Sequence, residues 1–169
     1  MIVQKNFTNT FAVCTLINSK IPTLVTKEFN LDTDGNLKKK TTAHMSNGSM
    51  KLANFNGLIG FSNLLIDLKE NQCVTYGCPT ISPVDLITEK DWEAQGRPES
   101  SLPRSNKTFF WSEGPSILML DYDAPKNGNQ PLTKDELVSS LRKACPGLEN
   151  ASMLWWPSTS SCIYQGEKE

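Results

Sequence analysis

Histidine is almost absent from this sequence, and that absence argues against two kinds of site. His44 is the single histidine among 169 residues. A structural zinc site would need a second close pair of ligands beside Cys73 and Cys78, and the sequence offers none. A Cys–His nucleophilic pair would have to use His44, which lies in a polar segment typical of exposed side chains. The five cysteines are odd in number and widely spaced, so we expect free thiols rather than a disulfide framework.

Long apolar runs and an excess of charge are also absent. No apolar run approaches the length of a membrane span, and the N-terminus lacks a signal-peptide pattern, so we expect a cytoplasmic protein without a membrane partner. The net charge of −1 argues against a nucleic-acid-binding surface over the whole molecule, although it allows a local basic stripe. The apolar fraction of 38% is ordinary for a globular chain, and the length predicts a single domain.

The most informative feature that is present is a pair of acids after an apolar run. Residues 116–122 are predicted to form a buried strand, and Asp121 and Asp123 stand two positions apart at its end. Because side chains alternate along a strand, both carboxylates should point to the same side. Such a site suits Mg²⁺ or Mn²⁺, and two-metal enzymes use this chemistry to transfer nucleotidyl groups. The alternative is a solvated strand-to-loop turn, because Asp is common before a proline such as Pro125.

The following residues complete a predicted βαβ unit. Thr133 and Glu136 form a capping box that begins a helix, and residues 145–147 end it. Residues 152–156 are predicted to form the second strand, so Trp155 should be part of the core. Open α/β sheets bind ligands at the carboxyl ends of their strands, where the two acids would lie.

A hydroxyl-rich loop follows that second strand and should lie at the same edge of the sheet. It contains Ser158, Ser160 and Ser161. These side chains could grip a triphosphate or a sugar, but turn propensity alone also explains a serine-rich segment.

The first half of the chain is predicted to be rich in strands. Strands are expected at residues 11–17 and 23–29, followed by a turn at 32–36 and a returning strand from Leu37. Lys38–Lys39–Lys40 lies on that return and is better explained as an exposed edge than as a phosphate site.

Three further segments connect the two halves. A helix is predicted at residues 54–69, and a strand at 72–77. Residues 82–106 are predicted to be a long connection with one helical turn around Trp92.

We therefore expect one α+β (or α/β) domain over residues 1–169, with a βαβ-containing sheet. It should consist of a strand-rich module at 1–80 and a βαβ module at 104–169.

Several segments together resemble a known family. Residues 114–123, Gly-Pro-Ser-Ile-Leu-Met-Leu-Asp-Tyr-Asp, resemble motif I of archaeo-eukaryotic-type primases, in the branch found in phages, plasmids and integrative elements. Other stretches are similar to segments of that branch: residues 24–29, 32–35, 75–77, 103–110 and 156–164. The resemblance is spread over most of the chain, and only motif I is specific in itself.

The resemblance implies the N-terminal catalytic portion of a primase-polymerase for DNA replication. Asp121 and Asp123 would then coordinate Mg²⁺ or Mn²⁺, and Ser158, Ser160 and Ser161 would line a nucleotide pocket. Arg104 and Lys107 are candidates for phosphate contacts. The implied partners are single-stranded template DNA, nucleoside triphosphates and a replicative helicase.

Two family motifs are missing from this sequence. Relatives carry a histidine that contacts the triphosphate and a third metal-binding acid after motif I, whereas His44 precedes it. The chain is then either an N-terminal piece of a longer primase–helicase protein or a naturally shortened, inactive relative, and we favour the first. We expect it to be inactive by itself, so enzyme activity stays open. The rival functions are a non-catalytic module that binds DNA or a replication partner, and a metal-dependent nuclease built on the same acids.

Overall fold

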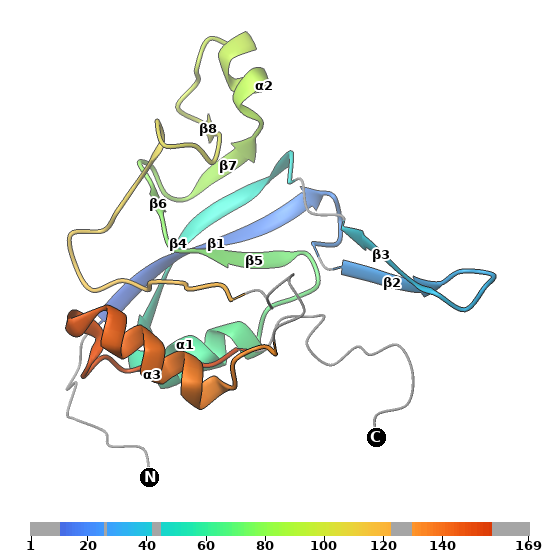
Figure 1. Ribbon diagram of the computed structural model, residues 1–169. Helices are drawn as coiled ribbons and strands as arrows, with labels where there is room; N and C mark the ends of the chain where they lie inside the picture. The colour runs from blue at the N-terminus through green and yellow to red at the C-terminus, as the bar shows by residue number, and fades with distance from the viewer. Residues whose placement is uncertain (1–10, 26, 42–44, 123–129, 157–169) are drawn as a thin grey trace.

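The fold is a mixed α+β arrangement centred on one five-stranded sheet (Figure 1). The computed structural model describes residues 11–25, 27–41, 45–122 and 130–156. The sheet has the strand order β5-β1-β4-β7-β8, in which every neighbouring pair is antiparallel except β7 and β8. Its strands are β1 (Phe11–Ile21), β4 (Asn47–Asn56), β5 (Gln72–Thr75), β7 (Val84–Ile87) and β8 (Ser101–Leu102).

Smaller elements surround this sheet. Two further strand pairs are not hydrogen-bonded into this sheet: β2 (Lys27–Leu31) with β3 (Leu37–Thr41), and β6 (Cys78–Pro79) with β9 (Phe109–Phe110). The β6 strand is buried against β1 and β4. The helices are α1 (Gly57–Ile66), α2 (Glu89–Ala94) and α3 (Lys134–Ala144), followed by the 3₁₀ turn η1 (Pro146–Leu148). In Figure 1, α1 and α3 lie at one end of the sheet and α2 at the other. Within the described residues, no helix has the length and hydrophobicity needed to cross a bilayer.

The hydrophobic core lies on the central strands. Burial of β1 is continuous over residues 14–17, and because successive side chains point to opposite faces, both faces of this central strand are covered there. In β7, Val84 and Leu86 are buried while Asp85 is exposed, which is the alternation of a half-buried strand. One cluster of buried side chains is contributed by β1, β4, β7 and β8, and it consists of Ile17, Met50, Val84, Leu86 and Leu102.

The structure bears out most of the local predictions in the first half. The first strand, the hairpin with its turn and the strand beginning at Gln72 are present, and α2 is the helical turn expected near Trp92. Strand β4 was not predicted, and it takes the first three residues of the expected 54–69 helix, which begins at Gly57 instead. Two segments of the connection expected at residues 82–106 form strands of the sheet instead, β7 and β8.

The predicted strand at residues 116–122 is wrong. Within this stretch Ser116 alone pairs with the sheet, through a parallel bridge to Val13 of β1. A parallel strand would next require a place beside Thr15, but β5 already occupies it, because Thr15 pairs with Thr75. The chain therefore leaves the sheet after Ser116, and Leu118 and Leu120 are exposed.

The predicted βαβ unit is wrong for the same reason. Helix α3 forms with both hydrogen bonds of the Thr133–Glu136 capping box, but residues 151–156 form no strand. Without a strand at 116–122, a crossover strand has no parallel partner. Trp155 was expected in the core, yet 47% of its surface is exposed.

Candidate functional site

Asp121 is the one member of the predicted acidic pair within the described residues. It follows the apolar segment that leaves the sheet after Ser116, and its side chain is exposed. Its neighbour Tyr122 is anchored, because the Tyr122 hydroxyl accepts a 2.8 Å hydrogen bond from the backbone N–H of Leu132. Leu132 immediately precedes Thr133, the N-cap of α3. The carboxylate therefore lies on a segment that is fixed at both ends, by the Val13–Ser116 bridge and by the start of α3.

The chemistry of Asp121 is that of a free hard-oxygen donor. No described lysine or arginine forms an ion pair with it. Mg²⁺ is usually held by one or two carboxylates together with water and substrate phosphates, so one exposed carboxylate fits part of such a ligand set. Among the described residues there is no cluster of three or more side chains of the metal-binding types.

The other predicted ligands lie outside the described residues. This holds for Asp123 and for Ser158, Ser160 and Ser161. The argument that placed Asp121 and Asp123 on one face depended on strand alternation, and residues 117–122 are not a strand. Their shared role stays a prediction that depends on sequence spacing alone.

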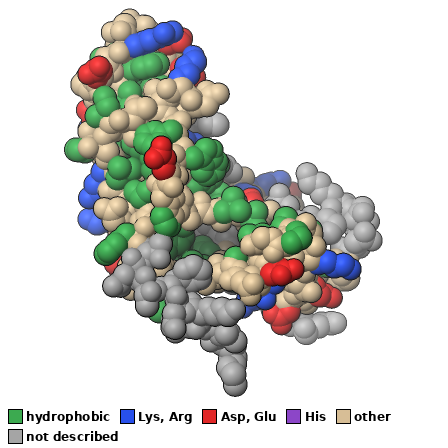
Figure 2. All heavy atoms as spheres, turned by 90° about the vertical axis from the view of Figure 1, so that its left-hand side faces the viewer, with side chains coloured by type: hydrophobic (Ala, Val, Ile, Leu, Met, Phe, Trp, Pro, Cys, Tyr) green, Lys and Arg blue, Asp and Glu red, His purple; other side chains and the backbone are tan. Residues whose placement is uncertain are grey.

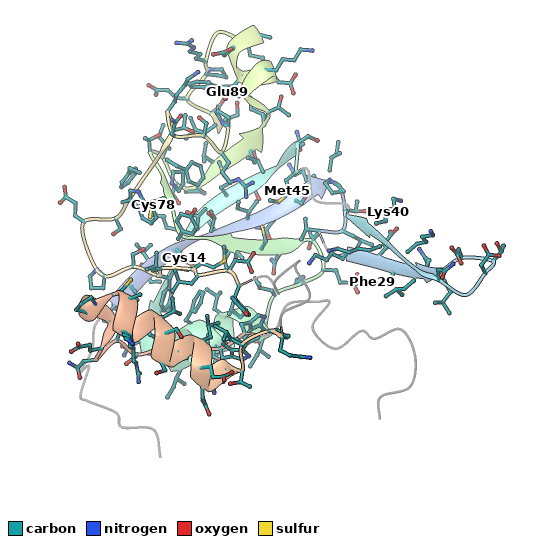
Figure 3. The ribbon with its side chains drawn as sticks, viewed as in Figure 1. Cys14, Phe29, Lys40, Met45, Cys78 and Glu89 are labelled. Atoms are coloured by element: carbon teal, nitrogen blue, oxygen red, sulfur yellow. The ribbon has the colours of Figure 1, made fainter. Side chains whose placement is uncertain are left out.

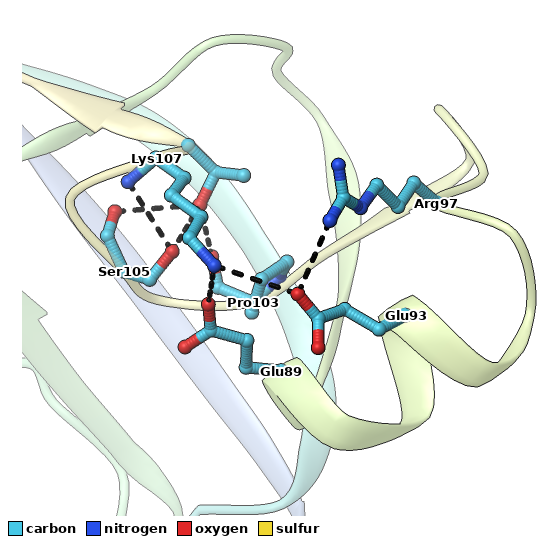
Figure 4. Close-up of polar contacts among 7 residues, drawn as sticks. Glu89, Glu93, Arg97, Pro103, Ser105 and Lys107 are labelled. Carbon is cyan, nitrogen blue, oxygen red and sulfur yellow. Dashed lines mark hydrogen bonds and ion pairs between the residues drawn. The ribbon is translucent and has the colours of Figure 1, made fainter.

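Lys107 is held in an ion-pair network with two glutamates of α2 (Figure 4). This helix lies at the end of the sheet opposite α1 and α3 (Figure 1). The Lys107 ammonium group contacts Glu89 at 2.5 Å and Glu93 at 3.4 Å, and Arg97 also contacts Glu93, at 3.3 Å. The hydrogen bond and charge of Glu89, with a smaller effect of Glu93, raise the pKa of Lys107. A phosphate would have to compete with two carboxylates for this side chain.

Arg104 is the more available of the two predicted phosphate contacts. It is exposed and lines a cavity of about 280 Å³ together with Ser46, Leu86 and Glu89. Lys107 contacts α2, whereas the segment that ends in Asp121 runs to the other end of the sheet, towards α3 (Figure 1). The structure therefore does not bring the predicted phosphate contacts and Asp121 into one site.

An exposed aromatic pair was not predicted as a unit. Tyr76 and Trp111 stack with ring centroids 4.9 Å apart and planes inclined by 10°, and Trp111 is 63% exposed. Figure 2 shows hydrophobic side chains gathered on the face formed by β6, β9 and the chain that follows them. Trp92 has a structural role instead, because its indole N–H donates to the Pro98 carbonyl and its ring packs against the core.

No family model matches this chain, and neither do any curated protein or solved structure. Its function must therefore be argued from its own residues.

Proposed function

We propose that the chain is the N-terminal catalytic portion of a DNA primase-polymerase from a phage, plasmid or integrative element. Asp121 and Asp123 hold Mg²⁺ or Mn²⁺ for nucleotidyl transfer onto a primer, with single-stranded DNA as template and nucleoside triphosphates as substrates. Ser158, Ser160 and Ser161 line the nucleotide pocket, and a replicative helicase is a further partner. The structural observation that supports the proposal is the exposed carboxylate of Asp121, which forms no ion pair with a described residue, at the end of an anchored apolar segment.

The reaction needs more groups than these two acids. In two-metal catalysis the cations must clamp both the attacking and the leaving oxygen, which requires a full set of protein ligands. The sequence lacks the later histidine and the third acid of the family pattern. Arg104 and Lys107 do not supply these groups in the described structure, because they do not lie in one site with Asp121 (Figure 1), and Lys107 is already paired with Glu89 and Glu93. The isolated chain therefore binds the metal but does not synthesise primers.

Metal binding at Asp121 tests the proposal directly. Titration with Mn²⁺ should broaden the amide resonances around Asp121 through paramagnetic relaxation, and the Asp121→Asn/Asp123→Asn double variant should abolish this broadening. Asp85→Asn is the matched control, because Asp85 is an exposed aspartate on β7. Equal broadening in the parent and the double variant would remove the two acids from any metal role. Primer synthesis by the isolated chain that depends on Asp121 would contradict its proposed inactivity.

A second candidate function is a non-catalytic module that binds single-stranded DNA. The observation that favours it is the exposed Tyr76–Trp111 stack, since aromatic side chains can stack on bases without sequence preference. Fluorescence titration of the parent and of Trp111→Leu with an oligothymidylate tests this function. The Mn²⁺ titration described above distinguishes it from the primase proposal. DNA binding that depends on Trp111, without any Asp121-dependent metal response, would favour the binding module.

A further inference from the structure

The β2–β3 hairpin is an arm that stands apart from the five-stranded sheet (Figures 1 and 3). Among the strands that the structure describes, β2 and β3 pair only with each other, from Lys27–Thr41 to Leu31–Leu37. The Asp32 carboxylate closes the turn by accepting hydrogen bonds from the backbone N–H groups of Asp34 and Asn36, at 3.0 and 2.7 Å. The base of the arm is fixed to the body by the bond from the Val25 N–H to the Glu70 carbonyl. The arm is therefore a defined structure that projects from the body, in which Leu31 and Lys39 are exposed while Lys27, Phe29 and Leu37 are half-buried.

The two faces of the arm differ in charge. Side chains alternate along each strand, and directly paired residues share a face. On one face Lys40 pairs with Glu28 at 3.4 Å, and Lys38 pairs with Asp32 of the turn at 3.3 Å. These lysines are neutralised by their own hairpin.

The second face combines apolar side chains with two lysines that no described carboxylate neutralises. Phe29 lies directly opposite Lys39, and Leu31 opposite Leu37. Lys27 shares this face, and neither it nor Lys39 forms an ion pair with a described residue. No carboxylate lies among these five side chains. Leu31 is 70% exposed, so the apolar part of this face is accessible near the turn of the arm.

We infer that this second face of the hairpin binds single-stranded nucleic acid. Single strands present phosphates that attract lysines and flat bases that stack on aromatic rings, and this face offers both kinds of group. Lys27 and Lys39 are diagonal neighbours about 7–8 Å apart, so each can approach a different phosphate on either side of a base stacked on Phe29. Duplex DNA fits less well, because its bases are stacked on one another and do not offer their flat faces to the Phe29 ring. The inference rests on the proposed function and extends it, because it identifies the second face of the hairpin as the surface that binds the single-stranded template.

Three single lysine variants test whether binding depends on the second face of the hairpin or on the total positive charge of the strand. Lys38→Ala, Lys39→Ala and Lys40→Ala each remove one positive charge from consecutive positions of the same strand. We expect Lys39→Ala alone to weaken binding to a fluorescently labelled oligothymidylate. Its salt dependence should fall by about 0.7 in logarithmic slope, the amount expected for one phosphate contact on a single strand. Equal effects of all three substitutions would overturn the inference, because a diffuse positive field would then explain them.

Phe29 gives an independent test of base stacking. Phe29→Ala should weaken oligothymidylate binding by about tenfold, which is the size expected for one lost stacking contact. Phe29→Leu keeps the apolar volume but removes the flat ring, and it should lose nearly as much affinity. Full affinity in Phe29→Leu would overturn the stacking role. Circular dichroism of each variant verifies that the sheet is intact.

Three outcomes separate this inference from the proposals that precede it. Oligothymidylate binding that is lost in Trp111→Leu and kept in Lys39→Ala would place the surface on the aromatic pair and overturn the inference. Binding to phosphatidylserine vesicles that depends on Lys39, without oligothymidylate binding, would assign the face to a membrane surface and also overturn it. Loss of binding in Lys39→Ala supports the hairpin even if Mn²⁺ does not respond to the Asp121 substitution, in which case only the primase proposal fails.

Discussion

The central sheet and the end of the molecule that carries α1 and α3 are held together in different ways. Around β1, β4 and β7 the side chains form a continuous buried cluster that includes Ile17 and Met50. At that end neither α1 nor α3 contains a buried residue, and Ile59 and Leu118 are 69% and 66% exposed. The free energy of folding must therefore come mainly from the sheet, whereas Asp121 belongs to the loosely packed end.

The largest expected effect is the loss of core volume in the sheet. Met50→Ala should lower the free energy of unfolding by about 2–5 kcal/mol, because the side chain is 1% exposed and its removal leaves a cavity. Ile59→Ala, which shortens an exposed side chain of α1, should change it by less than about 0.5 kcal/mol. Denaturant unfolding of both variants measures the difference. Similar losses in the two would show that α1 is part of the cooperative core.

Two glycines give a second, smaller contrast. A Cβ atom at Gly48 of β4 would collide with the carbonyl oxygen of Asn18 on β1, and this backbone atom cannot move away without disturbing the ladder. Gly48→Ala should therefore cost about 1–3 kcal/mol. At Gly147, in η1, a Cβ atom would meet nothing within 4 Å, so Gly147→Ala should be neutral or slightly stabilising. A neutral Gly48→Ala would mean that β1 and β4 can move apart.

The buried thiol of Cys14 should make the stability of the sheet depend on alkaline pH. Burial, with a smaller effect of the nearby Cys78, raises the pKa of Cys14 from 9.0 to about 11. The unfolded chain therefore loses this proton at lower pH than the folded chain, so stability should fall as the pH rises from about 9 towards 11. The loss should be about 1 kcal/mol near pH 10. Thermal unfolding between pH 8 and 10.5 measures it, and Cys14→Ala should have a flatter profile. Identical profiles would show that Cys14 does not cause the dependence.

The smallest global effect should come from the cap of α3. Thr133→Ala removes the hydroxyl that accepts from the Glu136 N–H, and this should cost the helix about 1 kcal/mol. Because α3 has no buried residue, the loss should appear as faster amide exchange in α3 while the global unfolding midpoint stays nearly unchanged. A clear drop in that midpoint would show that α3 is coupled to the sheet and would weaken the contrast between the central sheet and the end that carries α1 and α3.

Local signals in the sequence predicted the elements that local forces create. The Asp32–Gly35 turn and the Thr133–Glu136 capping box were recognisable because their hydrogen bonds join residues that are close in sequence. Strand β4 was missed because it is rich in polar residues, and its place depends on pairing with β1 and β7. The apolar run after Ser116 was assigned to a strand because hydrophobicity does not reveal that β5 already occupies that part of the edge.

The candidate site could be predicted only in part for similar reasons. Exposure of Asp121 follows from its position at the end of an apolar run, and the structure agrees. The pairing of Lys107 with Glu89 and Glu93 joins a loop to a helix that precedes it in the chain, so no spacing rule could reveal it. Likewise, the lysine triplet had to be placed on a strand in a known register before Lys39 could be separated from Lys38 and Lys40.

The position of the arm within the chain has a thermodynamic consequence. The hairpin is inserted in the connection between β1 and β4, and its strands pair with no strand of the main sheet. The entropy of closing a connection grows only with the logarithm of its length, so replacing residues 27–41 by a short linker should change the closure cost by less than about 1 kcal/mol. The arm can therefore vary in length and sequence at almost no cost to the fold, which makes it the part of the molecule most free to adapt to a new ligand.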